Sequence, residues 1–386
     1  MLSWPFALPS KYTRLYAWLV LDGKAIKRSQ VMEAKQILEL PATADLPLPP
    51  PDAMVVLSRL QSAGHDAVFV GGGVRDRLLG RTVDDWDLAT SAEPEVVAAL
   101  FEKVIPTGIA HGTVTVLVNG TCHEVTTYRL EGAYSDGRRP DDVVYTTDLT
   151  RDLSRRDFTI NAMAWDPNQQ QLYDPFDGRG DLSRRMVRAV GNPVIRLRED
   201  GLRALRAVRF ACVLDFDLSP DLLAAIPKTL EIFAGVSMER VYSEMVKMSR
   251  SPRFSAGIRS LYEVGLLNVF FPERTASPDG LFAGLGALEM PPESLASRWA
   301  LVCHDLGIGL RDVLRRLRFS NRQIKGITAL VEHRHLKIES LMTREELFGL
   351  ASMLGREHWE PYLEFRGALG SPTEDWRQIG ELARDF

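Results

Sequence analysis

Cysteine is scarce in this chain of 386 residues, which has only Cys122, Cys212 and Cys303. Three cysteines far apart in sequence exclude a disulfide framework and a zinc knuckle, and they predict reduced residues in the protein core. Long apolar runs are also missing. The segment 16–21 is too short for a membrane span or a secretory core, which predicts a cytoplasmic protein that does not associate with membranes. No internal repeat is visible, which excludes a solenoid.

A strong overall charge is missing too, since the formal net charge is −4, but positive charge is concentrated locally. Between residues 180 and 210 eight arginines stand against three acidic residues, an excess of five, and residues 311–325 carry six cations against Asp312. Each run can be a solvated helix face. Two such runs in one chain favour a polyanionic partner.

The most informative feature that is present is a pair of carboxylates, Asp85 and Asp87, a short distance after the glycine turn at 70–76. We expect a strand at 86–89 to carry this pair. Side chains two residues apart on a strand point to the same face of the sheet. Such a pair can bind one or two Mg²⁺ ions, while glycines let the backbone approach phosphate. Asp-x-Asp is also common on surface turns, but the two motifs in this order favour metal-dependent nucleotidyl transfer.

The chain divides by pattern into three parts, as expected for a length that exceeds one ordinary core. Residues 1–51 end in a proline-rich stretch and are predicted to be an appendage with a stiff linker. Helices are expected at 51–62, 74–79 and 94–101, with strands at 67–70, 113–118 and 123–128, the last two joined by a hairpin at Asn119–Gly120. Beyond about residue 174 the pattern is helical, with segments at 199–212, 221–233 and 238–248. We therefore expect an α+β protein.

Six segments resemble, in order, the motifs of one family: the glycine turn, Asp85–Trp86–Asp87, and residues 155–164, 174–178, 199–203 and 239–244. They are similar to the motif set of the bacterial class II tRNA nucleotidyltransferases, the CCA-adding enzymes of the poly(A) polymerase superfamily. This resemblance covers residues 51–248 and weakens beyond them. It implies a small nucleotidyltransferase head at 52–175, a helical neck with a nucleotide-selecting motif at 176–236, and a helical body and tail that bind tRNA at 237–386.

The resemblance also implies the reaction and the residues that perform it. C, C and A would be added without a template to the tRNA 3′ end from CTP and ATP, with Mg²⁺ as cofactor and pyrophosphate as product. Asp85 and Asp87 would hold the metal. Glu124, on the neighbouring strand, is either a third catalytic carboxylate or a structural acid paired with an arginine. The nucleotide would be bound by Gly71, Gly72, Arg75, Arg155, Arg156, Asp157, Asn161, Asp200, Arg203, Arg206 and Arg209, with Asp157 accepting hydrogen bonds from ribose hydroxyls.

Asp200 and Arg203 are the predicted base-selecting pair. Three residues apart on a helix, they would share one face and present an acceptor beside a donor. Cytosine and adenine offer an exocyclic amine next to an unprotonated ring nitrogen, whereas uracil and guanine offer a carbonyl next to a ring N–H. Each mismatch would cost roughly 1–3 kcal/mol. The alternative is an intrahelical salt bridge on a solvated face.

Other functions remain as alternatives. A poly(A) polymerase shares the head motifs, but residues 107–114 resemble those of the tRNA enzymes. A CC-adding enzyme would have a shortened loop at 129–140, whereas this loop is full length and suits a mobile lever; an A-adding enzyme stays open. The intact carboxylates argue against an inactive tRNA-binding module, and the histidines around His304 do not complete a phosphohydrolase ligand set. The tail is short, and Arg315, Arg316 and Arg318 are the predicted contacts to the tRNA backbone.

Overall fold

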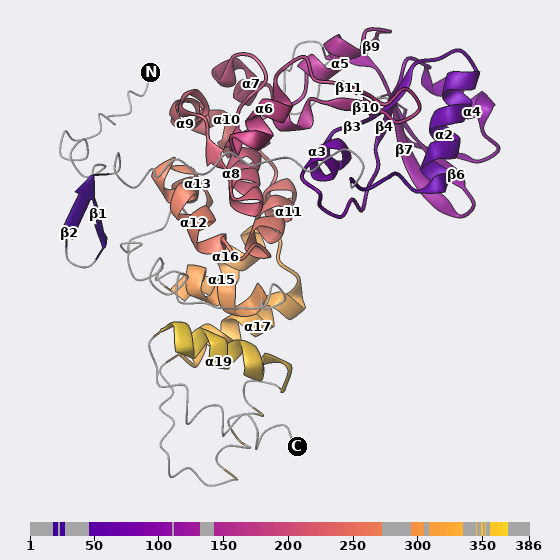
Figure 1. The fold of residues 1–386 in the computed structure, drawn as a ribbon. Coiled ribbons are helices and arrows are strands. Elements are labelled where there is room, and N and C mark those ends of the chain that lie inside the picture. Colours follow the sequence, from indigo (N-terminus) through magenta and orange to yellow (C-terminus); the bar gives the residue numbers. More distant parts are fainter. Residues whose placement is uncertain are drawn as a thin grey trace, which may run out of the picture.

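The computed structural model describes residues 46–109, 112–131, 143–271, 295–304, 309–334 and 356–369, the strands β1 (Trp18–Leu21) and β2 (Lys24–Lys27), and positions 345, 349 and 352. Its head is built on a seven-stranded mixed sheet, and helices follow it along the rest of the described chain (Figure 1). This is the α+β architecture that the sequence predicts. In the described parts, no helix has both the length and the apolar character needed to cross a membrane.

The strand order of the head sheet is β11-β10-β3-β4-β7-β6-β5. All neighbouring strands are antiparallel except β4 and β7, which are parallel, with Leu88 opposite Val125. The predicted hairpin forms at Asn119 and Gly120, which both have positive φ, as a tight two-residue turn requires. The strands are β3 (Ala67–Val70), β4 (Leu88–Thr90), β5 (Val104–Gly108), β6 (Thr113–Val118), β7 (Thr121–Thr127), β10 (Ala164–Asp166) and β11 (Gln171–Tyr173).

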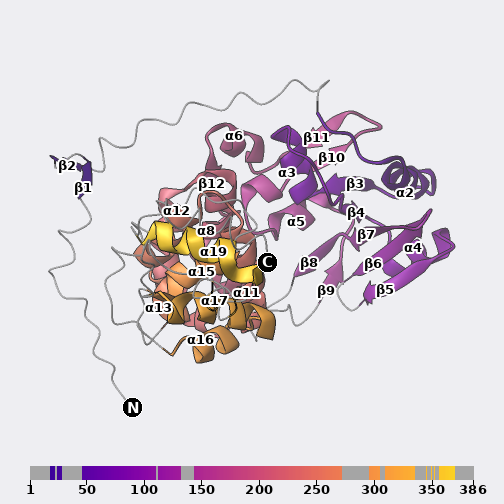
Figure 2. The ribbon, with the colours of Figure 1, turned by 90° about the horizontal axis from the view of Figure 1, so that it is seen from below.

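Helices cover both faces of the sheet. Helices α2 (Pro51–Ser62) and α4 (Pro94–Leu100) lie on the outer side, and α5 (Leu149–Ser154) lies on the side nearer the helical region (Figure 2). The outer face packs Phe69 and Leu88 into the main core, whereas Val68, Val70 and Ala89 form a second small core with Leu153 of α5. This alternation along β3 and β4 is the period of two that strands impose.

The helical region begins with α6 (Gly178–Ser183), α7 (Pro193–Glu199) and α8 (Leu202–Leu214). The start of the helix predicted at 199–212 is therefore wrong, because the helix is interrupted at Asp200 and Gly201. The predicted helix at 221–233 is also interrupted, since the turn η5 (Ile226–Thr229), which contains Pro227, separates α9 (Pro220–Ala225) from α10 (Leu230–Ala234). The helix predicted at 238–248 is confirmed as α11 (Met238–Ser249).

Further helices continue away from the head and end at α19 (Trp359–Ala368), drawn in yellow in Figure 1. Between them lie α12 (Phe254–Glu263), α13 (Leu266–Phe270), α15 (Leu295–His304), α16 (Leu310–Arg316) and α17 (Asn321–Glu332). In the segment 1–51, β1 and β2 pair as an antiparallel hairpin. Cys212 and Cys303 are buried as predicted, but Cys122 is exposed on β7, so a core position for it was wrong.

Candidate active site

A cavity of about 620 Å³ opens where the head meets α8 and α11. Its lining combines the glycine turn, the carboxylate pair and a large group of arginines. The residues that the sequence predicted and that line the cavity are Gly71, Gly72, Arg75, Asp85, Asp87, Arg155, Arg156, Asp157, Asn161, Asp200, Arg203, Arg206 and Arg209. Glu124 is not in this lining. Eight further lining residues were not predicted as site residues: Gly73, Asp76, Thr82, Val83, Asp84, Phe210, Arg240 and Lys247.

The carboxylate pair lies immediately before β4 rather than on it, because the strand begins only at Leu88. The segment is nevertheless extended. Trp86 is buried, with its ring 5.1 Å from that of Phe69, while Asp85 and Asp87 on either side of it are exposed. The backbone N–H of Val70 donates to the Asp87 carbonyl over 3.0 Å and fixes the segment to β3. The two carboxylates therefore share a face, as predicted, although the strand was placed too early.

The glycine turn brings backbone and charged groups close together. Gly71 precedes α3 (Gly72–Leu78) with φ of 73°, a conformation that other residues rarely adopt. A Cβ at Gly71 would lie 3.0 Å from Nη1 of Arg156 and 4.0 Å from Oδ2 of Asp87. A side chain here would therefore press on both groups. The Arg75 guanidinium, one turn into α3, donates to both oxygens of Asp76, at 3.0 and 2.7 Å, and to Oδ1 of Asn161 at 2.7 Å.

Negative charge is concentrated beside the turn. Desolvation by burial raises the pKa of Asp87, with Arg156 opposing this and Asp85 adding to it. Burial also raises the pKa of Glu124 on β7, and Asp87 and Asp85 raise it further while Arg129 lowers it. Glu124 is one residue before Val125, which is the partner of Leu88 in the parallel β4–β7 pair. Glu124 on β7 thus lies beside Asp87, which immediately precedes β4.

The residues present fit a divalent cation. Among the described residues, no hydrogen bond or ion pair engages the side chains of Asp85 and Asp87, and no cluster of three or more His, Cys, Asp or Glu forms a complete metal cage. Mg²⁺ is usually held by one or two carboxylates and completes its shell with water and substrate phosphate. Two exposed carboxylates that repel each other match that donor set. The glycine turn beside them lets the backbone approach a phosphate.

Asp157 is placed differently from its predicted role. Its Oδ1 accepts from the Phe158 backbone at 2.8 Å and from Asn161 at 3.0 Å, and its Oδ2 accepts from Nε and Nη2 of Arg206 at 2.8 and 2.6 Å. A carboxylate offers about four acceptor positions, so all are occupied. Acceptance from ribose hydroxyls is therefore not what this geometry provides. Burial alone would raise the pKa of Asp157, but Arg206 and the hydrogen bonds hold it well below its usual range.

Asp200 and Arg203 both line the cavity but do not lie on one helix face. Asp200 ends α7 in an extended conformation, and Gly201 separates it from α8. A Cβ at Gly201 would lie 2.7 Å from the Ile232 carbonyl, so only glycine fits this break without a shift. The prediction of a shared helix face was wrong because that close approach interrupts the helix.

Each member of the pair has its own ionic partner. Asp200 accepts from Arg240 through two bonds, Nη1 to Oδ1 at 3.1 Å and Nη2 to Oδ2 at 2.6 Å, and its Oδ1 also accepts from the Leu202 N–H at 3.0 Å. Arg203 pairs with Glu199. Among the described residues, Oδ2 of Asp200 therefore keeps one acceptor position that no protein donor occupies, and Asp200 itself lines the cavity.

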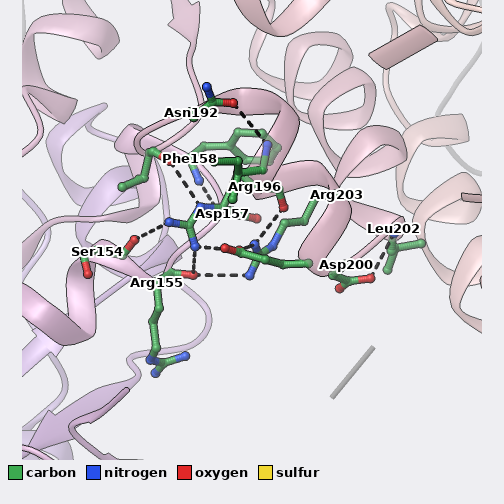
Figure 3. Close-up of polar contacts among 12 residues, drawn as sticks. Ser154, Arg155, Asp157, Phe158, Asn192, Arg196, Asp200, Leu202 and Arg203 are labelled. Atoms are coloured by element: carbon green, nitrogen blue, oxygen red, sulfur yellow. Dashed lines mark hydrogen bonds and ion pairs between the residues drawn. The ribbon is translucent and has the colours of Figure 1, made fainter. Parts of the chain in front are cut away.

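Two arginines of the helical region donate hydrogen bonds to the end of α5 in the head (Figure 3). Arg196 donates to the Ser154 carbonyl at 2.8 Å and to the Arg155 carbonyl at 3.0 Å, and Arg203 donates to the same Arg155 carbonyl at 3.3 Å. The carboxylate of Glu199 binds both guanidinium groups. Arg155 itself points away from this cluster, as Figure 3 shows, and pairs with Asp152 at 2.8 Å. Arg196 and Arg203 are thus fixed to the segment that carries Arg155 and Arg156.

The residues that sequence reasoning missed hold the arginines in place. The Phe210 ring has guanidinium carbons of Arg209, Arg75 and Arg206 at 3.5, 5.0 and 5.5 Å from its centre. Glu244 accepts from Arg209 at 2.7 Å. Arg240 and Glu244 lie in the motif at 239–244, so their signal was present in the resemblance. Arg240 contacts Asp200 across 40 residues and Glu244 contacts Arg209 of α8 across 35, which spacing alone does not reveal.

The predicted RNA-binding arginines lie on and after α16. Arg315 and Arg318 are largely exposed, and Arg318 pairs with Glu239 at 2.9 Å. Arg316 is half-buried. For the phosphohydrolase alternative, Nδ1 of His333 contacts the Ala329 carbonyl at 2.8 Å, which is a local helix contact. Asp305 and His335 lie outside the described residues, as does most of the predicted lever loop.

Comparison with known families defines the class first. The family model described as the Poly A polymerase head domain matches residues 67–188, and the one described as a probable RNA and SrmB-binding site of polymerase A matches residues 215–277. The sheet, the cavity and these matches define a nucleotidyltransferase head with a helical region behind it.

Similar proteins then define the family. The chain is 40% identical to the CCA-adding enzyme of Geobacillus stearothermophilus over 345 residues, 87% of this chain and 82% of the relative. The structure of the Bacillus stearothermophilus CCA-adding enzyme in complex with CTP matches with a TM-score of 0.74 and 36% identity, over 88% of this chain and 83% of that one. The chain belongs to the family of CCA-adding enzymes.

A more distant structure supports the fold alone. The Thermotoga maritima CCA-adding enzyme complexed with tRNA-CCA matches with a TM-score of 0.64 at 18% identity, over 87% of this chain and 82% of that one. The resemblance inferred from the six motifs is confirmed.

Proposed function

We propose that this protein adds C, C and A to the 3′ end of tRNA, using CTP and ATP and releasing pyrophosphate. The observation that carries this proposal is the single cavity in which the carboxylate pair, the glycine turn and the Asp200–Arg240 pair meet. Family membership supports it, because the relatives at about this identity are CCA-adding enzymes.

Transfer of the nucleotide requires that charge be managed around the α-phosphate. Asp85 and Asp87 would hold Mg²⁺, with Glu124 as a third carboxylate on the neighbouring strand. When bound, the metal lowers the pKa of the attacking 3′-hydroxyl and neutralises charge on the leaving pyrophosphate. Gly71 and Gly72 let the backbone approach the triphosphate, and the guanidinium of Arg156 beside Gly71 supplies a planar donor fork for its oxygens.

The base would be selected by Asp200 and Arg203. The remaining acceptor position on Oδ2 of Asp200 suits the exocyclic amine of cytosine or adenine, while a guanidinium N–H suits the unprotonated ring nitrogen beside it. Uracil and guanine would place a carbonyl oxygen against the carboxylate. Arg240 orients that carboxylate, so the protein itself would replace a template strand.

The remaining helices would bind the tRNA. We assign residues 52–175 to the catalytic head, 176–236 to the neck and 237–386 to the body and tail. Arg315, Arg316 and Arg318 would contact the phosphate backbone. Reversal of these three charges should lower tRNA affinity and flatten its salt dependence, while Asp221→Lys, an exposed change on α9, serves as the control. If tRNA affinity and its salt dependence did not change, the assignment of these three arginines to tRNA binding would be wrong.

The decisive experiment offers tRNAs that end at the discriminator base, at C and at CC. Each is incubated with CTP, ATP or both, and the products are sized at single-nucleotide resolution. Completion of CCA on the shortest tRNA is expected. Addition to the CC end alone would make the protein an A-adding enzyme, and long A tails would make it a poly(A) polymerase.

A further inference from the structure

A second cavity, of about 830 Å³, lies at the opposite end of β3 from the glycine turn. Its walls come from the starts of β3 and α5 and from the ends of β10 and β11. Its charge is opposite in character to that of the catalytic cavity: the lining includes no Lys or Arg but contains four aspartates, Asp66, Asp148, Asp166 and Asp174. Nucleotides and RNA would be repelled from it.

Tyr128, one of the residues that line this acidic cavity, carries a buried hydroxyl. Tyr128 has no exposed surface, and its hydroxyl has no hydrogen-bond partner among the described residues. Burial raises the pKa of Tyr128, and Asp66, Asp152, Tyr173 and Asp166 raise it further. Asp66, Tyr173 and Asp166 line the same cavity as Tyr128. Buried polar groups almost always have a partner, so the missing one indicates a ligand position.

Asp66 is an acceptor of this cavity with unused capacity. Its backbone is fixed on both sides, because its N–H donates to Oγ of Ser91 at 2.9 Å and its carbonyl accepts from Oγ1 of Thr90 at 2.6 Å. Its carboxylate has no partner among the described residues. Asp166, in contrast, accepts from three protein donors and keeps at most one acceptor position.

The remaining walls are mixed, with the polar side chains of Gln61, His65, Thr147, Thr150 and Gln169 beside apolar ones. Val68, Leu149, Leu153 and Pro175 lie between the polar groups, and Tyr128 and Tyr173 add aromatic rings. The volume is that of an organic-ligand site rather than of one hydrated metal ion. Ammonium groups suit carboxylates, phenol oxygens and aromatic faces, while methylenes suit the apolar walls.

We propose that this second cavity binds an organic polyamine, a cation with ammonium groups joined by methylene chains, with one ammonium between Asp66 and Tyr128. Because the cavity lies between the sheet and α5, a ligand bound there would hold α5 against the sheet. Occupancy is therefore expected to raise the melting temperature of the protein as well.

The test is calorimetric titration of the full chain with spermidine, without tRNA or nucleotide, because those polyanions bind polyamines themselves. One saturable site is expected. Asp66→Asn should weaken binding about tenfold and Tyr128→Phe about threefold, while the exposed control Asp221→Asn and the double variant Asp85→Asn, Asp87→Asn should stay within about twofold. Thermal melts establish that each variant is folded, and Asp66, being exposed, can be changed without disturbing the core.

Three results would overturn the proposal. Unchanged affinity in Asp66→Asn would place the amine elsewhere, and loss of binding in the Asp85, Asp87 double variant would place it at the catalytic carboxylates. Absence of binding in the millimolar range, or equal binding of Mg²⁺ with the same dependence on Asp66, would mean that the cavity holds water or an inorganic cation.

Discussion

The guanidinium of Arg240 holds the carboxylate of Asp200 through two nearly parallel hydrogen bonds, of 3.1 and 2.6 Å. Arg240 is on α11, and Asp200 is in the break between α7 and α8. The orientation of a proposed base-selecting residue is therefore determined by a helix that follows the neck. Choice of base and position of α11 are physically connected.

Replacement of Arg240 should therefore relax nucleotide choice. In Arg240→Gln the Asp200 carboxylate loses its orienting partner, so discrimination against UTP and GTP is expected to fall about tenfold, while addition of C and A persists. Competitive incorporation from mixed nucleotides measures this ratio. Arg250→Gln, an exposed change just after α11, is the matched control. Full selectivity in Arg240→Gln would show that Asp200 needs no such partner.

Replacement of Asp85 and replacement of its neighbour Asp84 should have different effects on activity. Asp85→Asn removes a proposed metal ligand and is expected to reduce all nucleotide addition below detection. Asp84→Asn, one residue earlier and also exposed, should retain most activity. Single-turnover assays over a range of Mg²⁺ concentrations make the comparison. Comparable losses in both variants would contradict the assignment of Asp85 as a ligand.

Glu124→Gln distinguishes a catalytic from a structural carboxylate. If Glu124 shares the metal with Asp87, the Mg²⁺ concentration needed for half-maximal activity should rise about tenfold or more. The melting temperature should change little, because Glu124 is exposed. A fall in melting temperature with an unchanged Mg²⁺ requirement would instead assign it to a structural pair with Arg129.

Asp157→Asn should destabilise the protein because Arg206 loses its hydrogen-bonded carboxylate and keeps only Glu244, at 4.0 Å, as an ionic partner. The expected cost is about 3 kcal/mol in the free energy of unfolding. The folded pKa of Asp157 is lowered, so its contribution is complete above the unfolded value of about 4 and is lost as pH falls through the folded value. Denaturant unfolding should therefore separate wild type and variant at pH 7 and bring them together in strong acid. A gap that stays constant with pH would exclude this ion pair as the cause.

Arg196 and Arg203 should differ in the kind of defect that they cause. Arg196→Met removes two hydrogen bonds to the end of α5, so kcat/KM is expected to fall for CTP and ATP alike, without a change in their selection. Arg203→Met should alter selection itself. Steady-state kinetics with all four nucleotides provide the comparison. Altered selection in Arg196→Met would extend the base-reading unit to that residue.

Most of the head could be predicted from sequence because its signals are local. The helix at Pro51–Ser62, the Asn119–Gly120 hairpin and the glycine turn each follow from residues within a few positions of one another. The cavity residues were found through motif order. The errors have tertiary causes. Continuous helical spacing hid the break at Gly201, which is imposed by the distant Ile232 carbonyl, and the four hydrogen bonds of Asp157 come partly from Arg206, 49 residues away.

The parallel pairing of β4 and β7 also bears on how the protein acquires activity. Leu88 and Val125 are direct partners although a whole β-hairpin and α4 separate them in sequence. Closing such a loop costs chain entropy before the contact stabilises anything, so pairings of this kind form late in folding. Asp87 and Glu124 meet only once this central junction is made. A newly synthesised chain should thus bring the proposed metal ligands Asp87 and Glu124 together in one of its later folding steps, after its hairpins and helices exist.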